Sequence, residues 1–203
     1  MQYPLFFECV ESIILSDPLS EVLGTFENGQ IEYTYLDIVK SAGHSCPTVA
    51  GAYLMAWRGL EALYPDVTPV RGEIAVFFKE SESDGVAGVI GNVLSQITGA
   101  TQVSGFKGLN GKFARHSLMN FSQDISSSVR FTNIKSGKSV DIFYDPSTVF
   151  PASTMQGLMQ KVLSEKASKS ERSEFGTLWQ ERVEKILCHH HDNEDVIRVV
   201  EVS

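Results

Sequence analysis

The sequence predicts an α+β fold, with helices packed on a mainly antiparallel sheet. Segments with helical periodicity and segments with strand character alternate in mixed order, without the repeated strand–helix–strand units of a parallel sheet. No internal repeat or low-complexity linker divides the 203 residues, so we expect one domain over residues 1–203.

The composition is that of a globular protein, with 42% hydrophobic and 21% charged residues. A formal net charge of −8 and the lack of a basic run argue against a nucleic-acid partner. No apolar run approaches the roughly 20 residues that span a bilayer, so no membrane association is expected. The cysteines Cys9, Cys46 and Cys188 are odd in number and widely spaced, which favours a reducing, cytoplasmic location over a disulfide framework.

The first 40 residues predict a helix, a hairpin and a second short helix. A hairpin is expected over residues 21–35, around the turn 27–30, where Asn-Gly tolerates positive φ. One or two helical turns follow over residues 37–40. The first helix precedes the hairpin, ends at Asp17-Pro18, and lacks the basic residues of a secretory signal. Its apolar residues recur at helical spacing: Phe6, Phe7, Val10, Ile13 and Ile14.

The middle of the chain predicts two helices around a buried strand at residues 73–79. The first helix runs over residues 47–63, because Pro47 suits the first helical position. The second helix is expected to be capped by Asp84 and ended by Gly99.

The second half predicts strands over residues 112–121, 128–134, 139–144 and 195–202. Between the last two strands, Ser153 and Gln156 resemble a capping box for a helix. A further helix then places apolar residues on one face: Phe175, Leu178, Trp179, Val183 and Ile186.

One histidine and one cysteine stand two residues apart where the helix over residues 47–63 begins. Cys46 falls at or beside the helix N-cap, where exposed N–H groups and the dipole favour a thiolate by ~0.3–1 kcal/mol. An extended backbone would let His44 face the same side as Cys46. Neutral imidazole and thiolate are preferred zinc ligands, so the pair predicts a site for a divalent metal ion, with zinc as the first candidate.

Other interpretations of His44 and Cys46 stay open. A lone cysteine is often a small buried hydrophobe, and the pair supplies two ligands where zinc takes four. The pair is also compatible with a metal-free thiol enzyme, with Cys46 as the nucleophile and His44 or a spatial neighbour as the base. A third hypothesis is a binding module for a small pterin-like or acidic molecule. Whether the protein is an enzyme is left open.

Additional metal donors stand in one other cluster, formed by Cys188, His189, His190 and His191. The alternative for this cluster is a polar helix end, where histidine interacts favourably with the dipole. His116, in the expected strand over residues 112–121, is predicted to be a core or edge residue.

A glycine-rich segment, Gly105-x-x-Gly108-x-x-Gly111 with Lys107 and Lys112, has the composition of a phosphate-binding loop. Such a loop needs a strand before it and a helix after it, whereas this segment follows a helix and leads into a strand. We expect a flexible pocket rim instead.

Three segments resemble the FmdE family, named for a formylmethanofuran dehydrogenase operon protein. GHSCPTVAGAYLMAWRGLEAL resembles its GHxCPG signature, and ESDGVAGVIGNVLSQITGAT and SGFKGLNGKFA are similar to later family segments. The resemblance covers roughly residues 35–145. It implies an FmdE-like α+β core, commonly a homodimer, with a bound metal at His44 and Cys46. No C-terminal zinc-finger cysteines are present.

The sequence departs from the family pattern at three positions. Gly85 and Ala100 stand where relatives often carry cysteine, and Thr48 follows Pro47 in place of glycine. Because the extra thiols are missing, a dithiol redox role is not expected.

Overall fold

The computed structural model describes residues 2–202 and confirms the α+β prediction. Within these residues the helices are α1 (Pro18–Val22), α2 (Tyr35–Ala42), α3 (Pro47–Leu63), α4 (Ala87–Thr98), α5 (Met155–Leu163) and α6 (Lys169–Glu184). The strands are β1 (Ile13–Ser16), β2 (Gln30–Tyr33), β3 (Ile74–Phe78), β4 (Met119–Asn120), β5 (Val129–Asn133), β6 (Ser139–Tyr144) and β7 (Ile197–Val202). None of these helices is both long and apolar enough to cross a bilayer.

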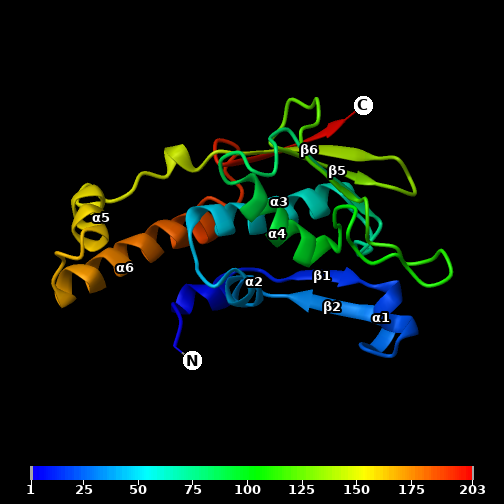
Figure 1. Ribbon diagram of the computed structural model, residues 1–203, viewed down its shortest axis with the longest axis horizontal. Coiled ribbons are helices and arrows are strands. Elements are labelled where there is room, and N and C mark those ends of the chain that lie inside the picture. Colours follow the sequence, from blue (N-terminus) through cyan, green and yellow to red (C-terminus); the bar gives the residue numbers. More distant parts are fainter. Residues whose placement is uncertain (1, 203) are drawn as a thin grey trace.

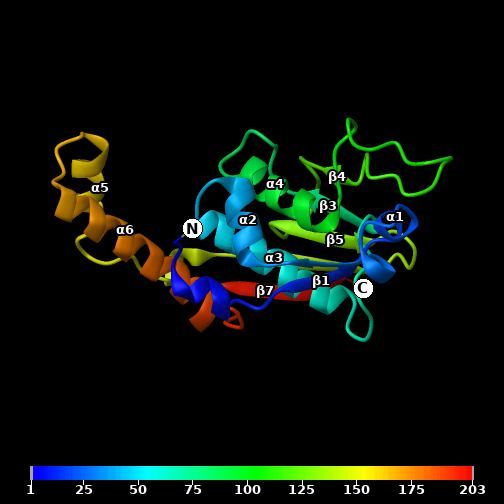
Figure 2. The same cartoon turned by 90° about the horizontal axis from the view of Figure 1, so that it is seen from below.

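The elements form three layers (Figure 1). One outer layer is a five-stranded sheet in the order β4-β3-β5-β6-β7, in which only the β3–β4 pair is parallel. The middle layer is α3 with α4, and the other outer layer is α2 with the antiparallel β1–β2 ribbon. Both views show α5 and the start of α6 extending away from this body (Figures 1 and 2).

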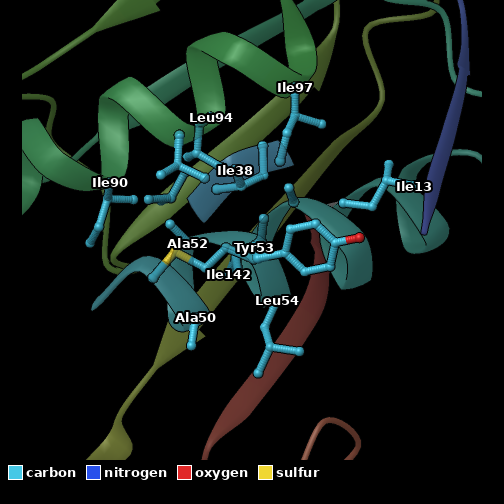
Figure 3. Close-up of a cluster of buried hydrophobic side chains, with 14 of the residues drawn as sticks. Ile13, Ile38, Ala50, Ala52, Tyr53, Leu54, Ile90, Leu94, Ile97 and Ile142 are labelled. Atoms are coloured by element: carbon cyan, nitrogen blue, oxygen red, sulfur yellow. The ribbon is translucent and has the colours of Figure 1, made fainter. Parts of the chain in front are cut away.

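The central element is α3, which the structure begins and ends where the sequence predicts. Its buried residues include Ala50, Tyr53 and Leu54, which are not exposed to solvent at all. Ile13 of β1, Ile38 of α2, Ile97 of α4 and Ile142 of β6 belong to the same cluster (Figure 3). A helix that is apolar around most of its circumference must be covered on several sides, and here all three layers contribute.

Two glycines let α3 approach the sheet closely. A Cβ at Gly51 would lie 2.2 Å from the Tyr144 ring, and one at Gly59 would lie 2.4 Å from Ile142 Cδ1. Real Cβ atoms do not tolerate such distances, so the spacing between helix and sheet requires glycine at both positions.

The N-terminal predictions are wrong in part. In place of one long helix, a 3₁₀ turn at Leu5–Cys9 is followed by β1, because Ile13 pairs with Tyr33 in the ribbon and buries its side chain. The hairpin over residues 21–35 is also wrong: β2 pairs with β1, and Asp17-Pro18 starts α1. The predicted turn does hold Asn28 at a positive φ of 53°.

The expected strand over residues 112–121 is reduced to β4. Most of this segment is irregular, and Phe113 and Ser117 adopt left-handed φ values of 62° and 58° that interrupt strand pairing. His116 is therefore not a strand residue: it is partly exposed, and its Nδ1 lies 3.0 Å from Ser117 Oγ.

Two helix caps also differ from prediction. The N-cap of α4 is Val86, and Asp84 instead accepts a hydrogen bond from the Ser81 N–H. At α5 the N-cap is Thr154, without a side-chain cap, whereas a capping box joins Ser168 and Glu171 at α6. The other expected strands correspond to β5, β6 and β7, and Gly99 ends α4 as predicted.

A buried ion cluster ties the start of α1 to distant segments. Asp17 accepts hydrogen bonds from Arg71 Nη1 at 2.9 Å and from Arg115 Nη2 at 2.6 Å, and it also caps α1. Burial raises the pKa of Asp17, but the two arginines and the backbone N–H of the helix cap lower it by more. The pKa of Asp17 is therefore below its usual value.

We expect Gly59→Ala to destabilise the protein. The added methyl group gains up to ~1 kcal/mol of helix propensity but overpacks the core, which costs ~1–3 kcal/mol. Urea denaturation should show a net loss of about 1 kcal/mol. The control is Gly176→Ala in α6, where nothing lies within 4 Å of the new Cβ, and this variant should be stabilised. Equal effects of the two variants would contradict the packing argument.

We expect Asp17→Asn to lose about 3 kcal/mol of stability at pH 7, because the buried Arg115 and the half-buried Arg71 lose their carboxylate while the cap is kept. Because the pKa of Asp17 is lower in the folded protein than in the unfolded chain, its carboxylate stabilises the folded state at pH values above the unfolded pKa of about 3.9. This stabilisation is lost as the pH falls through the folded-state pKa. The difference from wild type should therefore shrink in acid. Glu61→Gln, at the exposed Arg58–Glu61 pair, is the control and should change stability by less than about 1 kcal/mol.

Candidate functional site

The candidate site is the short segment between α2 and α3. Gly43, at a left-handed φ of 78°, ends α2 and donates its N–H to the Val39 carbonyl. Cys46 is the N-cap of α3, as predicted, and Pro47 takes the first helical position. His44 and Cys46 thus flank Ser45 on a connection whose two ends are both set by helix caps.

Cys46 is half-buried, and its sulfur faces the first turn of α3. Sγ accepts a hydrogen bond from the Val49 N–H at 3.4 Å. The thiol is thus bonded to one of the backbone N–H groups that a helix leaves without an intrahelical partner at its start.

His44 is exposed, and its ring is oriented by the backbone. Nδ1 lies 3.0 Å from the Ala42 carbonyl oxygen. Because a carbonyl only accepts, Nδ1 carries the proton and donates it, which leaves the lone pair of Nε2 free. Metal-ligating histidines are typically held in the same way, by an N–H bond from the other ring nitrogen.

Residues far along the chain hold Ser45 between these two side chains. Trp179 Nε1 and Gln180 Nε2 of α6 each donate to the Ser45 carbonyl at 3.1 Å. The Ser45 hydroxyl lies 2.9 Å from the Tyr35 hydroxyl of α2. The backbone of the site is therefore anchored from both sides.

Tyr144 of β6 links the site to the sheet. Its hydroxyl donates to the Pro47 carbonyl at 2.7 Å, and its ring lies against Gly51. Burial raises the pKa of Tyr144 and of Tyr35. Both hydroxyls are therefore protonated near neutral pH and can donate hydrogen bonds.

The Cys188–His191 cluster is not gathered around Cys46. Cys188 and His189 lie in a π-helical turn after α6, and the Nδ1 of His190 accepts from the Asn193 amide at 3.2 Å. His191 stacks on Trp57, with ring centroids 5.4 Å apart. Trp57 lies about three turns after Cys46 on α3, roughly 16 Å along the axis. Within residues 2–202, no three His, Cys, Asp or Glu side chains are grouped to hold a metal ion.

Two cavities flank the segment. One, of about 640 Å³, includes Gly43, Ser45 and Gln180 in its wall, and the buried Gln180 Oε1 has no hydrogen-bond partner. The other, of about 370 Å³, lies between the starts of α3 and α4 and the ends of β3 and β6. Its lining includes Pro47, Thr48, Lys79, Ser126, Ser128 and Tyr144. A small molecule could therefore bind next to the His44–Cys46 segment on either side.

The sequence did not identify the residues that anchor this segment. Trp179 was predicted only as part of an apolar helix face, and no motif singles out Tyr35, Tyr144 or Gln180. Each of these residues bonds a residue that is 10 to 135 positions away in the sequence. Local periodicity cannot predict such contacts.

The chain is similar to a solved structure, that of a tungsten formylmethanofuran dehydrogenase FmdE-like protein from Syntrophus aciditrophicus. The identity is 15%, the match covers 84% of this chain and 73% of that chain, and the TM-score is 0.43. No curated protein matches at a significant level.

The family model described as "FmdE, Molybdenum formylmethanofuran dehydrogenase operon" matches residues 42–193, which include both His44 and Cys46. This match extends over more than half of the sequence. The chain belongs to the FmdE family.

Proposed function

We propose that this FmdE-family protein binds a divalent metal ion, with zinc as the first candidate, through His44 and Cys46 at the start of α3. The observation that carries the proposal is the orientation of His44. Its Nδ1–H is held by the Ala42 carbonyl, so Nε2 is free to bind a metal two residues before a thiol that faces a helix N-terminus.

The donor set fits an open metal site better than a closed one. Imidazole and thiolate are the ligand types that zinc prefers, but structural zinc sites use four protein ligands. This pair supplies two, so the other positions are left for water, a bound molecule or groups outside the described residues. An ion bound there would act as a Lewis acid toward such a molecule.

The surrounding residues have positioning roles in this proposal. Trp179 and Gln180 hold the Ser45 carbonyl, and Tyr144 holds the Pro47 carbonyl, so the backbone on both sides of Cys46 is restrained. Restraint of this kind lowers the entropy cost of bringing two donors to one ion.

A homodimer is part of the proposal, as the family resemblance implies, and a second copy is one source of additional donors. We also place the protein in a reducing compartment such as the cytoplasm, because Cys9, Cys46 and Cys188 are all free.

A metal-free thiol enzyme is the second candidate. It is favoured by the same Cys46 geometry and by the lack of a third donor within residues 2–202. A small-molecule binding module is the third candidate. It is supported by the cavity of about 370 Å³, whose lining includes Pro47, the residue after Cys46.

Elemental analysis of tag-free protein by mass spectrometry tests the metal proposal. We expect near-stoichiometric metal in wild type and its loss in His44→Ala and in Cys46→Ser. Serine keeps an N-cap oxygen for α3, so loss of metal in Cys46→Ser would not reflect loss of the cap. His116→Ala and Cys9→Ser remove the same atom types elsewhere and should retain the metal. Sedimentation of the same samples gives the oligomeric state.

Absence of metal from wild type, even after reconstitution with zinc, would overturn the proposal, as would retention of metal in both site variants. The metal-free protein would then be alkylated. A Cys46 that reacts much faster than the exposed Cys9 would support the thiol enzyme, whereas equal rates would exclude it and favour the binding module.

A further inference from the structure

A third cavity, of about 440 Å³, has Pro18 of α1 in its wall. Helix α1 lies at the end of the molecule opposite α5 (Figures 1 and 2). Its wall combines the segment before β3, the irregular segment before β4 and the turn after β5. Cationic and ionisable side chains dominate its polar lining: Arg71, Lys112, Arg115, His116, Lys135 and Glu73. This concentration of positive charge is unexpected in a chain with a net charge of −8.

The positive charges around this cavity outnumber the carboxylates. Asp17 is shared by Arg71 and Arg115, and Glu73 pairs with Lys135. Lys112 is exposed and forms no salt bridge within the described part of the chain. Four cations against two carboxylates leave an excess of two positive charges.

Arg115 is the buried member of the group. Its side chain is 8% exposed. Nη2 donates to Asp17 and Nη1 donates to the Arg71 carbonyl, but the buried Nε has no hydrogen-bond partner among residues 2–202. Burial lowers the pKa of Arg115, and Asp17 offsets this only in part. A buried guanidinium that shares its single carboxylate is incompletely compensated, which is costly unless another anion is close.

The backbone around Arg115 is shaped to hold the guanidinium at the cavity. A Cβ at Gly72 would lie 1.1 Å from Arg115 Nη1, so only glycine, at a φ of 86°, leaves room for it. In the same cavity wall, Gly111 and Phe113 adopt left-handed φ values of 78° and 62° on either side of Lys112. A bulky residue such as Phe113 rarely adopts this conformation, and such strain is concentrated at ligand sites. Of the glycine-rich segment, Gly111 and Lys112 lie in the wall of this cavity.

We propose that this cavity binds a small molecule through an oxyanion of the phosphate class, with Arg115 and Lys112 as the main cationic contacts. Arginine and lysine are the usual side chains for such groups. The volume is that of a small-molecule site, and the acidic remainder of the chain disfavours a long polyanion. The site is separate from His44 and Cys46 and does not depend on the proposed metal.

Titration calorimetry with inorganic phosphate tests this proposal, with sodium chloride at matched ionic strength as the blank. We expect saturable binding to the wild-type protein and at least tenfold weaker binding to Lys112→Glu. Lys166→Glu makes the same charge change at an exposed site near α6 and should bind within twofold of wild type. Because Lys112 is exposed, circular dichroism should show both variants folded.

Two results would overturn the proposal. The first is no saturable binding by wild type, and the second is equal weakening in both charge reversals, which would indicate only a general electrostatic effect. A parallel titration with malonate tests the ligand class. Tighter binding of malonate than of phosphate would overturn the phosphate assignment, and weaker binding would support it.

Discussion

The close approach of α3 to the sheet is the constraint on which the rest of the structure depends. Gly51 and Gly59 face Tyr144 and Ile142 across that contact, where any side chain would push the helix outward. With α3 at this distance, α4 and the β1–β2 ribbon can cover its other sides and close one continuous core. Since cores are packed to crystal-like density, a shift of α3 would be felt in all three layers.

The same contact fixes the start of α3, and with it the candidate site. Tyr144 packs its ring against Gly51 and bonds the Pro47 carbonyl, so the packing of the helix also positions the residue that follows Cys46. Two side chains of α6 hold the Ser45 carbonyl. A donor pair on a loop gains precision when the loop is restrained by rigid elements on either side, and both restraints here come from distant parts of the chain.

The candidate site and the cavity beside α1 differ in their electrostatics. At the α3 N-terminus, the Cys46 sulfur accepts a backbone N–H bond and the ring of His44 is oriented by a backbone carbonyl. Beside α1, two arginines share Asp17, and the exposed Lys112 adds positive charge around a cavity. The Asp17 cluster joins α1, the segment before β3 and the segment before β4, and its two arginines with one carboxylate leave one positive charge beside the cavity.

The sequence by itself determined the elements whose signals are local. Pro47 and the apolar residues of α3 predicted that helix to the residue, Gly99 predicted the end of α4, and the FmdE signature singled out His44 and Cys46. Only the tertiary structure decided the N-terminal region, where pairing with β2 made a strand of residues whose spacing is helical. It also decided the anchors of the site, Tyr35, Tyr144 and Trp179, and the sharing of Asp17 by two arginines. These contacts join positions far apart in the chain, so their energies depend on packing that no local pattern encodes.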